Sequence, residues 1–161
     1  MKQDKIEISY QLYDDISELE KEDGWLLNKA REATKLAYAP YSKFHVGAVA
    51  KMMNGEIVAG SNQENASYPA GLCAERVLLA SSSTLYPEVA IETMAISYHN
   101  INGESNEPIS PCGICRQTLR EYEDRFHKPI RLILGGMGGK IMVFEKASDL
   151  LPFAFTSKDM I

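Results

Sequence analysis

The segment FHVGAVAKMMNGEIVAG, residues 44–60, contains two apolar runs on either side of the dipeptide Asn54-Gly55. Asn-Gly accepts the positive φ angles of a type I′ turn, so this dipeptide between apolar runs is the strongest short signal for a β-hairpin. Two antiparallel strands are therefore expected, over residues 44–52 and 56–60.

Helical and extended patterns flank this hairpin on both sides. Residues 25–37 carry apolar side chains near helical spacing, and Pro40 is expected to end that helix. Good helix formers and an amphipathic pattern predict two more helices, from Cys73 to about Ser82 and from Cys112 to about Phe126. Further strands are predicted at residues 89–98, 130–134 and 140–144.

This order of elements is helix, hairpin, helix, strand, helix, strand, strand. Strands joined by helices indicate a partly parallel sheet covered on both faces. The sequence therefore predicts an α/β fold, a three-layer α/β/α sandwich with a mixed, mostly five-stranded sheet. The main domain is expected over residues 24–161, whereas the charged residues 1–23 are expected to form an N-terminal extension that docks loosely or adds a short helix.

Composition excludes several classes of protein. The 161 residues are 45% hydrophobic and 24% charged, which is ordinary globular composition, and the formal net charge is −5. Binding to nucleic acid or to anionic membrane needs basic patches, so neither partner is expected. No apolar run approaches the ~20 residues of a membrane span, and the polar start shows no secretory signal. A cytoplasmic location is therefore expected. Because that compartment is reducing and the chain has three cysteines, an odd number, no disulfide framework is expected.

The spacing of those cysteines indicates a metal site. Cys112 and Cys115 lie three residues apart, and Cys73 lies on a different predicted helix. Each is placed at a predicted helix N-terminus, where the helix dipole favours the thiolate form that binds metal. Three protein ligands leave one tetrahedral position of a zinc ion open, which is typical of a catalytic site.

Glu75 follows Cys73 by two residues, and a carboxylate there could carry protons beside the open position. Zinc deaminases of nucleobases carry the pattern H-x-E…P-C-x-x-C, in which cysteine can replace the histidine. Here the pattern is Cys73-Ala74-Glu75 with Pro111-Cys112-Gly113-Ile114-Cys115. Arg76 and Arg116 each follow a residue of this pattern, and a guanidinium donating to a ligand sulfur would offset the excess negative charge.

With these motifs the chain resembles the small, homotetrameric, three-cysteine cytidine deaminases. The resemblance covers roughly residues 26–157 and includes the motifs APYSKFHVGA (39–48), NQENASYP (62–69), CAER (73–76), SPCGICRQ (110–117) and LLPFAF (150–155). It implies one zinc ion per subunit, a homotetramer with shared active sites, and hydrolysis of cytidine and 2′-deoxycytidine to uridine or 2′-deoxyuridine and ammonia in pyrimidine salvage.

The resemblance also implies roles for individual residues. Glu75 would be the catalytic acid and base, moving a proton from water to the base N3, and Cys73, Cys112 and Cys115 would bind zinc. Phe44 would stack on the pyrimidine, the Ala74 N–H would bind the base carbonyl, and Asn62 and Glu64 would bind the ribose 3′-hydroxyl. Phe155 would complete the pocket of a neighbouring subunit, and Tyr68 would cross an interface.

Other functions remain open from the residues alone. The enzyme could act on another aminopyrimidine nucleoside, such as blasticidin S. The cysteines could form a redox pair, or a structural zinc site in a protein-interaction module, with His45, His99 or His127 as fourth ligand. The glycine-rich residues 135–139 are no phosphate loop, because Leu134 and Ile141 stand where that motif needs glycine and Ser or Thr.

Overall fold

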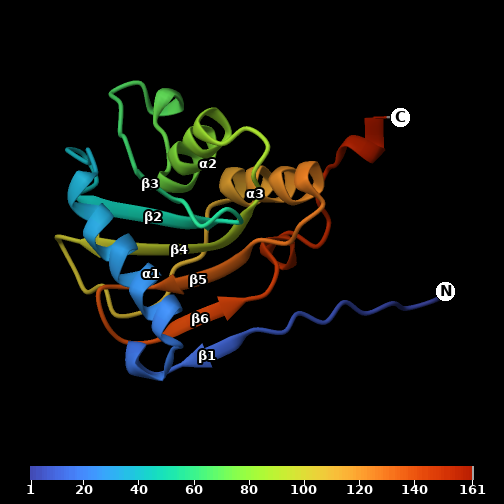
Figure 1. Ribbon diagram of the computed structural model, residues 1–161, viewed down its shortest axis with the longest axis horizontal. Coiled ribbons are helices and arrows are strands. Elements are labelled where there is room, and N and C mark those ends of the chain that lie inside the picture. The colour runs from blue at the N-terminus through green and yellow to red at the C-terminus, as the bar shows by residue number, and fades with distance from the viewer. Residues whose placement is uncertain (161) are drawn as a thin grey trace.

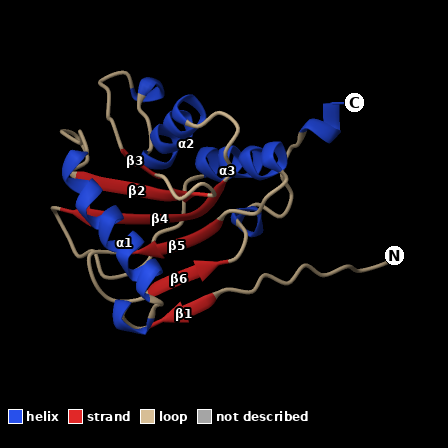
Figure 2. Cartoon of the chain, viewed as in Figure 1, coloured by secondary structure: helices blue, strands red, loops and turns tan. Residues whose placement is uncertain are grey.

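The computed structural model describes residues 1–160. The chain folds into one sheet with helices on both faces (Figures 1 and 2). The strands are β1 (Gln11–Tyr13), β2 (Phe44–Met52), β3 (Ile57–Ser61), β4 (Ile91–Asn100), β5 (Arg131–Gly135) and β6 (Ile141–Phe144). The α-helices are α1 (Lys21–Ala33), α2 (Ala74–Leu85) and α3 (Gly113–Phe126).

The sheet has the strand order β1-β6-β5-β4-β2-β3. Only β4 and β5 are parallel, and α3 makes the crossover between them, whereas all other neighbours are antiparallel. The expected three-layer sandwich with a mixed sheet is confirmed, and Gly55 has the positive φ of 86° that the hairpin turn requires. Strand β4 lies two residues further along the chain than predicted.

Two hydrophobic cores lie on opposite faces of the sheet. Helix α1 packs on β2 and β4, where its Leu27 and Ala30 are fully buried against Val49 and Ala95. Helices α2 and α3 cover the other face, where Leu78 and Leu119 pack on the even-numbered residues of β2 and β4. Alternate residues of one strand therefore face α1 or the pair α2 and α3.

The first twenty residues differ from the expectation. They contribute a sixth strand, because β1 pairs antiparallel with β6, in addition to a short 3-10 helix at Ile16–Glu18. The Tyr10 ring stacks on Phe144 with centroids 5.3 Å apart. Helix α1 begins at Lys21 and gives way to a 3-10 turn at Thr34–Leu36, so the helix ends earlier than Pro40 implies.

The topology brings two helix starts together. Strands β3 and β4 are both antiparallel to β2, so they run in the same direction and end at the same side of the sheet. Helix α2 follows β3 and α3 follows β4, which places the N-termini of both helices near that side (Figure 1).

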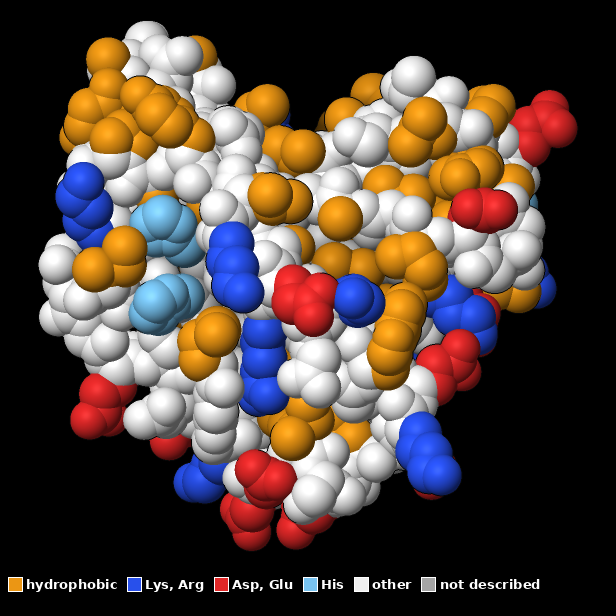
Figure 3. Space-filling model, turned by 60° about the vertical axis from the view of Figure 1, so that its left-hand side comes forward, with side chains coloured by type: hydrophobic (Ala, Val, Ile, Leu, Met, Phe, Trp, Pro, Cys, Tyr) orange, Lys and Arg blue, Asp and Glu red, His pale blue; other side chains and the backbone are white. Residues whose placement is uncertain are grey.

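The surface mixes acidic and basic side chains on the face drawn in Figure 3. Within residues 1–160, no helix has both the length and the apolar character needed to cross a membrane.

Candidate active site

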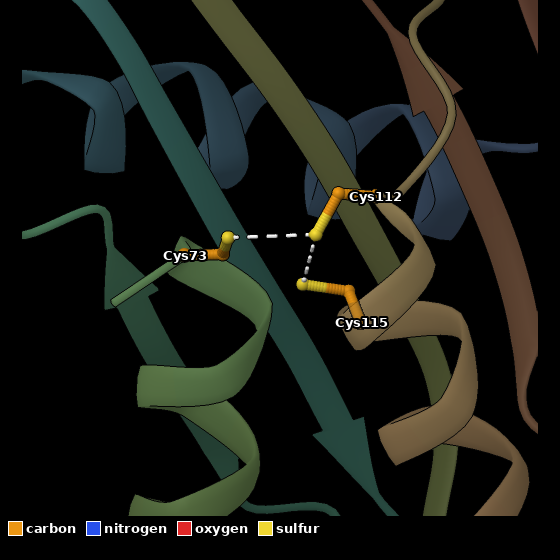
Figure 4. A group of neighbouring side chains, drawn as sticks. All are labelled: Cys73, Cys112 and Cys115. Carbon is orange, nitrogen blue, oxygen red and sulfur yellow. Dashed lines mark hydrogen bonds between the residues drawn. The ribbon is translucent and has the colours of Figure 1, made fainter. Parts of the chain in front are cut away.

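Three cysteine thiols converge where the first turns of α2 and α3 meet (Figure 4). Cys73 is the N-cap residue of α2, Cys112 is the N-cap residue of α3, and Cys115 lies in the first turn of α3. The Cys112 sulfur lies 3.6 Å from that of Cys73 and 3.4 Å from that of Cys115. Among residues 1–160, no other group of three or more Cys, His, Asp or Glu is arranged to hold a metal ion.

The spacing and chemistry of these thiols fit zinc. A tetrahedral ion with Zn–S bonds of about 2.3 Å separates its sulfur ligands by about 3.8 Å. Hydrogen bonding from Cys115 lowers the pKa of Cys73 to about 6, with Cys112 and the charge of Arg76 adding to the effect. Hydrogen bonding to Cys73, together with burial, raises the pKa of Cys115. Three thiols this close cannot all ionise alone, and a divalent cation removes that conflict.

Glu75 is a buried carboxyl group beside the cysteines. Glu75 is 5% exposed and lies in the first turn of α2, two residues after Cys73. Burial, with a smaller contribution from the negative charge of Cys73, raises its pKa to about 7. A carboxyl group that exchanges its proton near neutral pH is suited to general acid and base chemistry.

The two arginines have different surroundings. Arg76 lines the cavity next to the cysteines, and its charge favours the Cys73 thiolate. Arg116 instead donates to backbone carbonyls, from Nε to Pro111 at 2.8 Å and from Nη1 to Leu150 at 3.3 Å. Its guanidinium thus connects the turn before Cys112 to the C-terminal segment. These carbonyl bonds differ from the bond to a ligand sulfur that the sequence suggested for Arg116.

A cavity of about 490 Å³ opens onto Cys73, Cys112 and Glu75. This volume lies in the range of pockets for small ligands. Among the residues singled out from the sequence, its lining includes Phe44, Asn62, Glu64, Tyr68, Ala74 and Arg76. The lining also includes residues that the sequence did not single out, such as Val46, Leu72, Ile109 and Ile114. The cavity therefore brings most of the predicted site together.

Asn62 holds the start of β2, and Glu64 holds the segment that precedes it. Asn62 accepts from the Val46 N–H at 2.8 Å and donates to the Phe44 carbonyl at 2.9 Å. Glu64 accepts from the backbone N–H groups of Tyr41 at 2.9 Å and Ser42 at 3.3 Å. Hydrogen bonding to Ser42, followed by these backbone bonds, lowers the pKa of Glu64, so the cavity wall carries a stable negative charge.

Phe44 is supported from behind by Tyr98, which the sequence analysis missed. The two rings stack with centroids 5.0 Å apart and an interplanar angle of 15°. The Val46↔Tyr98 register of β2 and β4 places Tyr98 diagonally across from Phe44, on the same face. Only the register identifies this partner, because nothing near Tyr98 in the sequence marks it.

The rim of the cavity is apolar and exposed. Tyr68 is 78% exposed, and its ring meets that of Tyr41 edge to face. Phe155 does not line the cavity of its own chain and is 62% exposed, while its carbonyl accepts from Gln117 Nε2 at 2.7 Å. The predicted role of Phe155 in a neighbouring subunit stays a prediction.

The histidines lie apart from the cysteines. His45 and His99 are cross-strand partners in the sheet, and His127 caps the far end of α3. None joins the cysteine group, so the structure offers no histidine as a fourth ligand among residues 1–160.

A buried carboxyl group, a three-thiol metal site and an adjoining cavity define a metal-dependent hydrolytic enzyme. Comparison with known proteins makes this assignment specific. A family model, described as the cytidine and deoxycytidylate deaminase zinc-binding region, matches residues 20–127. The cytidine deaminase of Halalkalibacterium halodurans is 38% identical over 135 residues, covering 84% of this chain and 95% of that protein.

Two further relatives agree. A cytidine deaminase of Mycobacterium tuberculosis is 33% identical over 138 residues, covering 84% of this chain and 90% of that protein. The crystal structure of the cytidine deaminase from Burkholderia pseudomallei superposes with a TM-score of 0.71 and 37% identity, covering 81% of this chain and 97% of that one. The chain therefore belongs to the cytidine and deoxycytidylate deaminase family. It is a zinc-dependent hydrolase, and the three-cysteine cluster is the group able to hold the ion.

Proposed function

We propose that the enzyme hydrolyses the 4-amino group of free cytidine and 2′-deoxycytidine, giving uridine or 2′-deoxyuridine and ammonia in pyrimidine salvage. The observation that carries the proposal is the buried Glu75 beside three converging thiols, at the inner end of a nucleoside-sized cavity. The names of its relatives point to the same substrate.

Cys73, Cys112 and Cys115 would hold one zinc ion per subunit. When bound, zinc supplies an activated water that attacks C4 of the pyrimidine. Glu75 would take a proton from that water and deliver it to N3. It would then take the proton of the new C4 hydroxyl and pass it to the leaving amine, so that ammonia departs and a C4 carbonyl remains. Burial suits Glu75 to this work, because removing the carboxylate from water raises its pKa and makes it a stronger proton acceptor. Arg76 would stabilise the Cys73 thiolate, and Arg116 would hold the turn that carries Cys112.

The cavity wall would orient the nucleoside. Phe44, backed by Tyr98, offers a ring face for the pyrimidine. The Ala74 N–H begins α2, where first-turn N–H groups lack helical partners and can donate to the base carbonyl. Asn62 and Glu64 retain acceptor capacity beyond their backbone bonds and would grip the ribose 3′-hydroxyl.

Free nucleosides fit this site better than polynucleotides. A net charge of −5 and the acidic Glu64 in the cavity wall oppose a phosphate backbone. The same charge balance opposes anionic membranes, and we place the enzyme in the cytoplasm, where its substrates arise.

A homotetramer with shared active sites is the second part of the proposal. Tyr68 and Phe155 expose aromatic rings beside the cavity mouth and at the C-terminal segment, and a neighbouring copy would bury both. Mixing the defective variants Phe155→Ala and Glu75→Gln under conditions of subunit exchange tests this arrangement. Shared sites predict activity above that of either parent, whereas verified exchange without recovery would reject them.

Ammonia release from a panel of nucleosides tests the activity itself. The zinc-loaded enzyme should turn over cytidine and 2′-deoxycytidine, with cytidine 5′-monophosphate, blasticidin S and a single-stranded oligonucleotide as comparison substrates. Faster release from blasticidin S would replace the substrate assignment. A zinc-loaded protein that releases no ammonia from any of them would favour a structural zinc module.

A further inference from the structure

His45 and His99 stand directly opposite each other in the sheet. His45 belongs to β2 and His99 to β4, and the antiparallel register pairs their Cα atoms. Directly opposed residues of an antiparallel pair have Cβ atoms about 4.5–5.5 Å apart. Both side chains also project from the same face of the sheet, because paired residues share a face.

That face is the one covered by α1, but the helix ends before it reaches the two histidines. Val49 and Ala95 lie on this face against α1, and His45 and His99 are each four residues away along the same strands. Gly47 shows where the helix ends, because a Cβ there would lie 2.2 Å from the Ala30 carbonyl and 2.7 Å from the Thr34 nitrogen. His45, two residues nearer the strand end, is therefore only half-buried, and His99 is exposed.

Figure 3 shows two histidine side chains close together, one above the other, on the face that it draws. Neutral imidazole nitrogens bind Zn²⁺, Cu²⁺ and Ni²⁺ well, and water molecules can complete the coordination of such ions. The pair lies on the face of the sheet opposite the cysteine helices α2 and α3, and the charge of His45 also reaches the Glu64 carboxylate, whose pKa it helps to lower.

We propose that His45 and His99 form a second metal site, which binds a divalent transition-metal ion at the surface, separate from the catalytic zinc. The ion joins β2 to β4 across one hydrogen-bonded ladder. Phe44 precedes His45 in β2, and Tyr98 precedes His99 in β4. Because adjacent residues of a strand face opposite sides, these two rings stack on the cavity side of the sheet. An ion on the two histidines therefore holds the strands together directly behind the cavity wall.

Nickel titration of the zinc-loaded enzyme tests this site. Calorimetry should detect one bound Ni²⁺ per chain, and zinc analysis should show that the catalytic zinc stays in place. His45→Gln and His99→Gln each remove one metal ligand. Loss of a residue that only hydrogen-bonds to a ligand weakens metal binding about 10–100-fold, so each variant should weaken nickel binding by at least that factor. His127→Asn is the matched control and should bind nickel like the parent, because His127 lies alone at the αL C-cap of α3, where Asn is tolerated.

Thermal unfolding gives a second readout. Saturating Ni²⁺ should raise the unfolding temperature of the parent and of His127→Asn, because the ion binds only the folded register. It should leave the double variant His45→Gln/His99→Gln unshifted, and circular dichroism verifies that this variant is folded. Nickel binding that persists in the folded double variant, that displaces zinc one for one, or that is absent from the parent at millimolar nickel would overturn the proposal.

Discussion

The cysteine cluster lies at two helix N-termini, with Cys115 fully buried and Glu75 nearly so, whereas the two ends of the chain lie on the surface. Residues 1–12 are exposed, and Phe153, Phe155 and Met160 in the C-terminal segment each expose most of their side chain. The family match begins at residue 20, so the N-terminal segment falls outside it. The contrast indicates that the catalytic centre depends on the packed core, while the terminal segments add stability and contacts at its margin.

The largest effect is expected from Cys115→Ala. This side chain is completely buried within the cluster, so its loss leaves two thiols and should abolish zinc binding and activity together. Zinc analysis and ammonia release measure both. His127→Asn should keep full zinc occupancy. Loss of zinc in that variant would support the alternative in which a histidine is the fourth zinc ligand.

Glu64→Gln should affect substrate binding more than chemistry. It removes a charged acceptor from the cavity wall and weakens the bonds that hold Tyr41 and Ser42. Hydrogen bonds to charged groups contribute about 1.5–3 kcal/mol, so kcat/KM for cytidine should fall about 10–100-fold, mainly through KM. Glu88→Gln, at an exposed site outside this cavity, is the control. A fall in kcat with unchanged KM would contradict a binding role.

The buried carboxyl group should make stability depend on pH. The folded-state pKa of Glu75, about 7, lies above the ordinary 4.5, so between these values the folded metal-free protein binds more protons than the unfolded chain. Its stability should therefore fall as the pH rises from about 4.5 to 7, by up to about 3 kcal/mol. Glu75→Gln should lack this component, which denaturant unfolding of both metal-free proteins measures. Parallel pH profiles would show that Glu75 is not perturbed in this way.

The smallest effect is expected at the N-terminal segment. Tyr10→Ala removes the stacking on Phe144, and an aromatic pair contributes about 0.5–1.5 kcal/mol beyond its burial. The free energy of unfolding should fall by about that amount, with zinc content and kcat unchanged. Ser9→Ala is the control at a neighbouring exposed position. A loss of activity in Tyr10→Ala would show that the segment supports the site.

The sequence predicted the cysteine cluster better than the margins of the fold. Asn54-Gly55 sets the hairpin locally, and the cysteine pattern marks two helix starts without reference to the rest of the chain. Strand β1 escaped prediction because its pairing depends on β6, more than a hundred residues away in sequence. The alternation of Ile6, Ile8, Tyr10 and Leu12 was its only local signal. Tyr98 and the carbonyl partners of Arg116 likewise depend on long-range contacts.

In the proposed mechanism, Glu75 moves the proton beside a zinc ion that the three cysteines hold without it. Glu75→Gln separates these two roles, because the amide keeps the shape of the side chain but removes its acid–base function. We predict full zinc occupancy and a fall in kcat of about 10²–10⁴-fold, the usual contribution of a general acid or base. A fully zinc-loaded Glu75→Gln enzyme that deaminates cytidine within a few-fold of the parent rate would show that Glu75 is not the proton carrier.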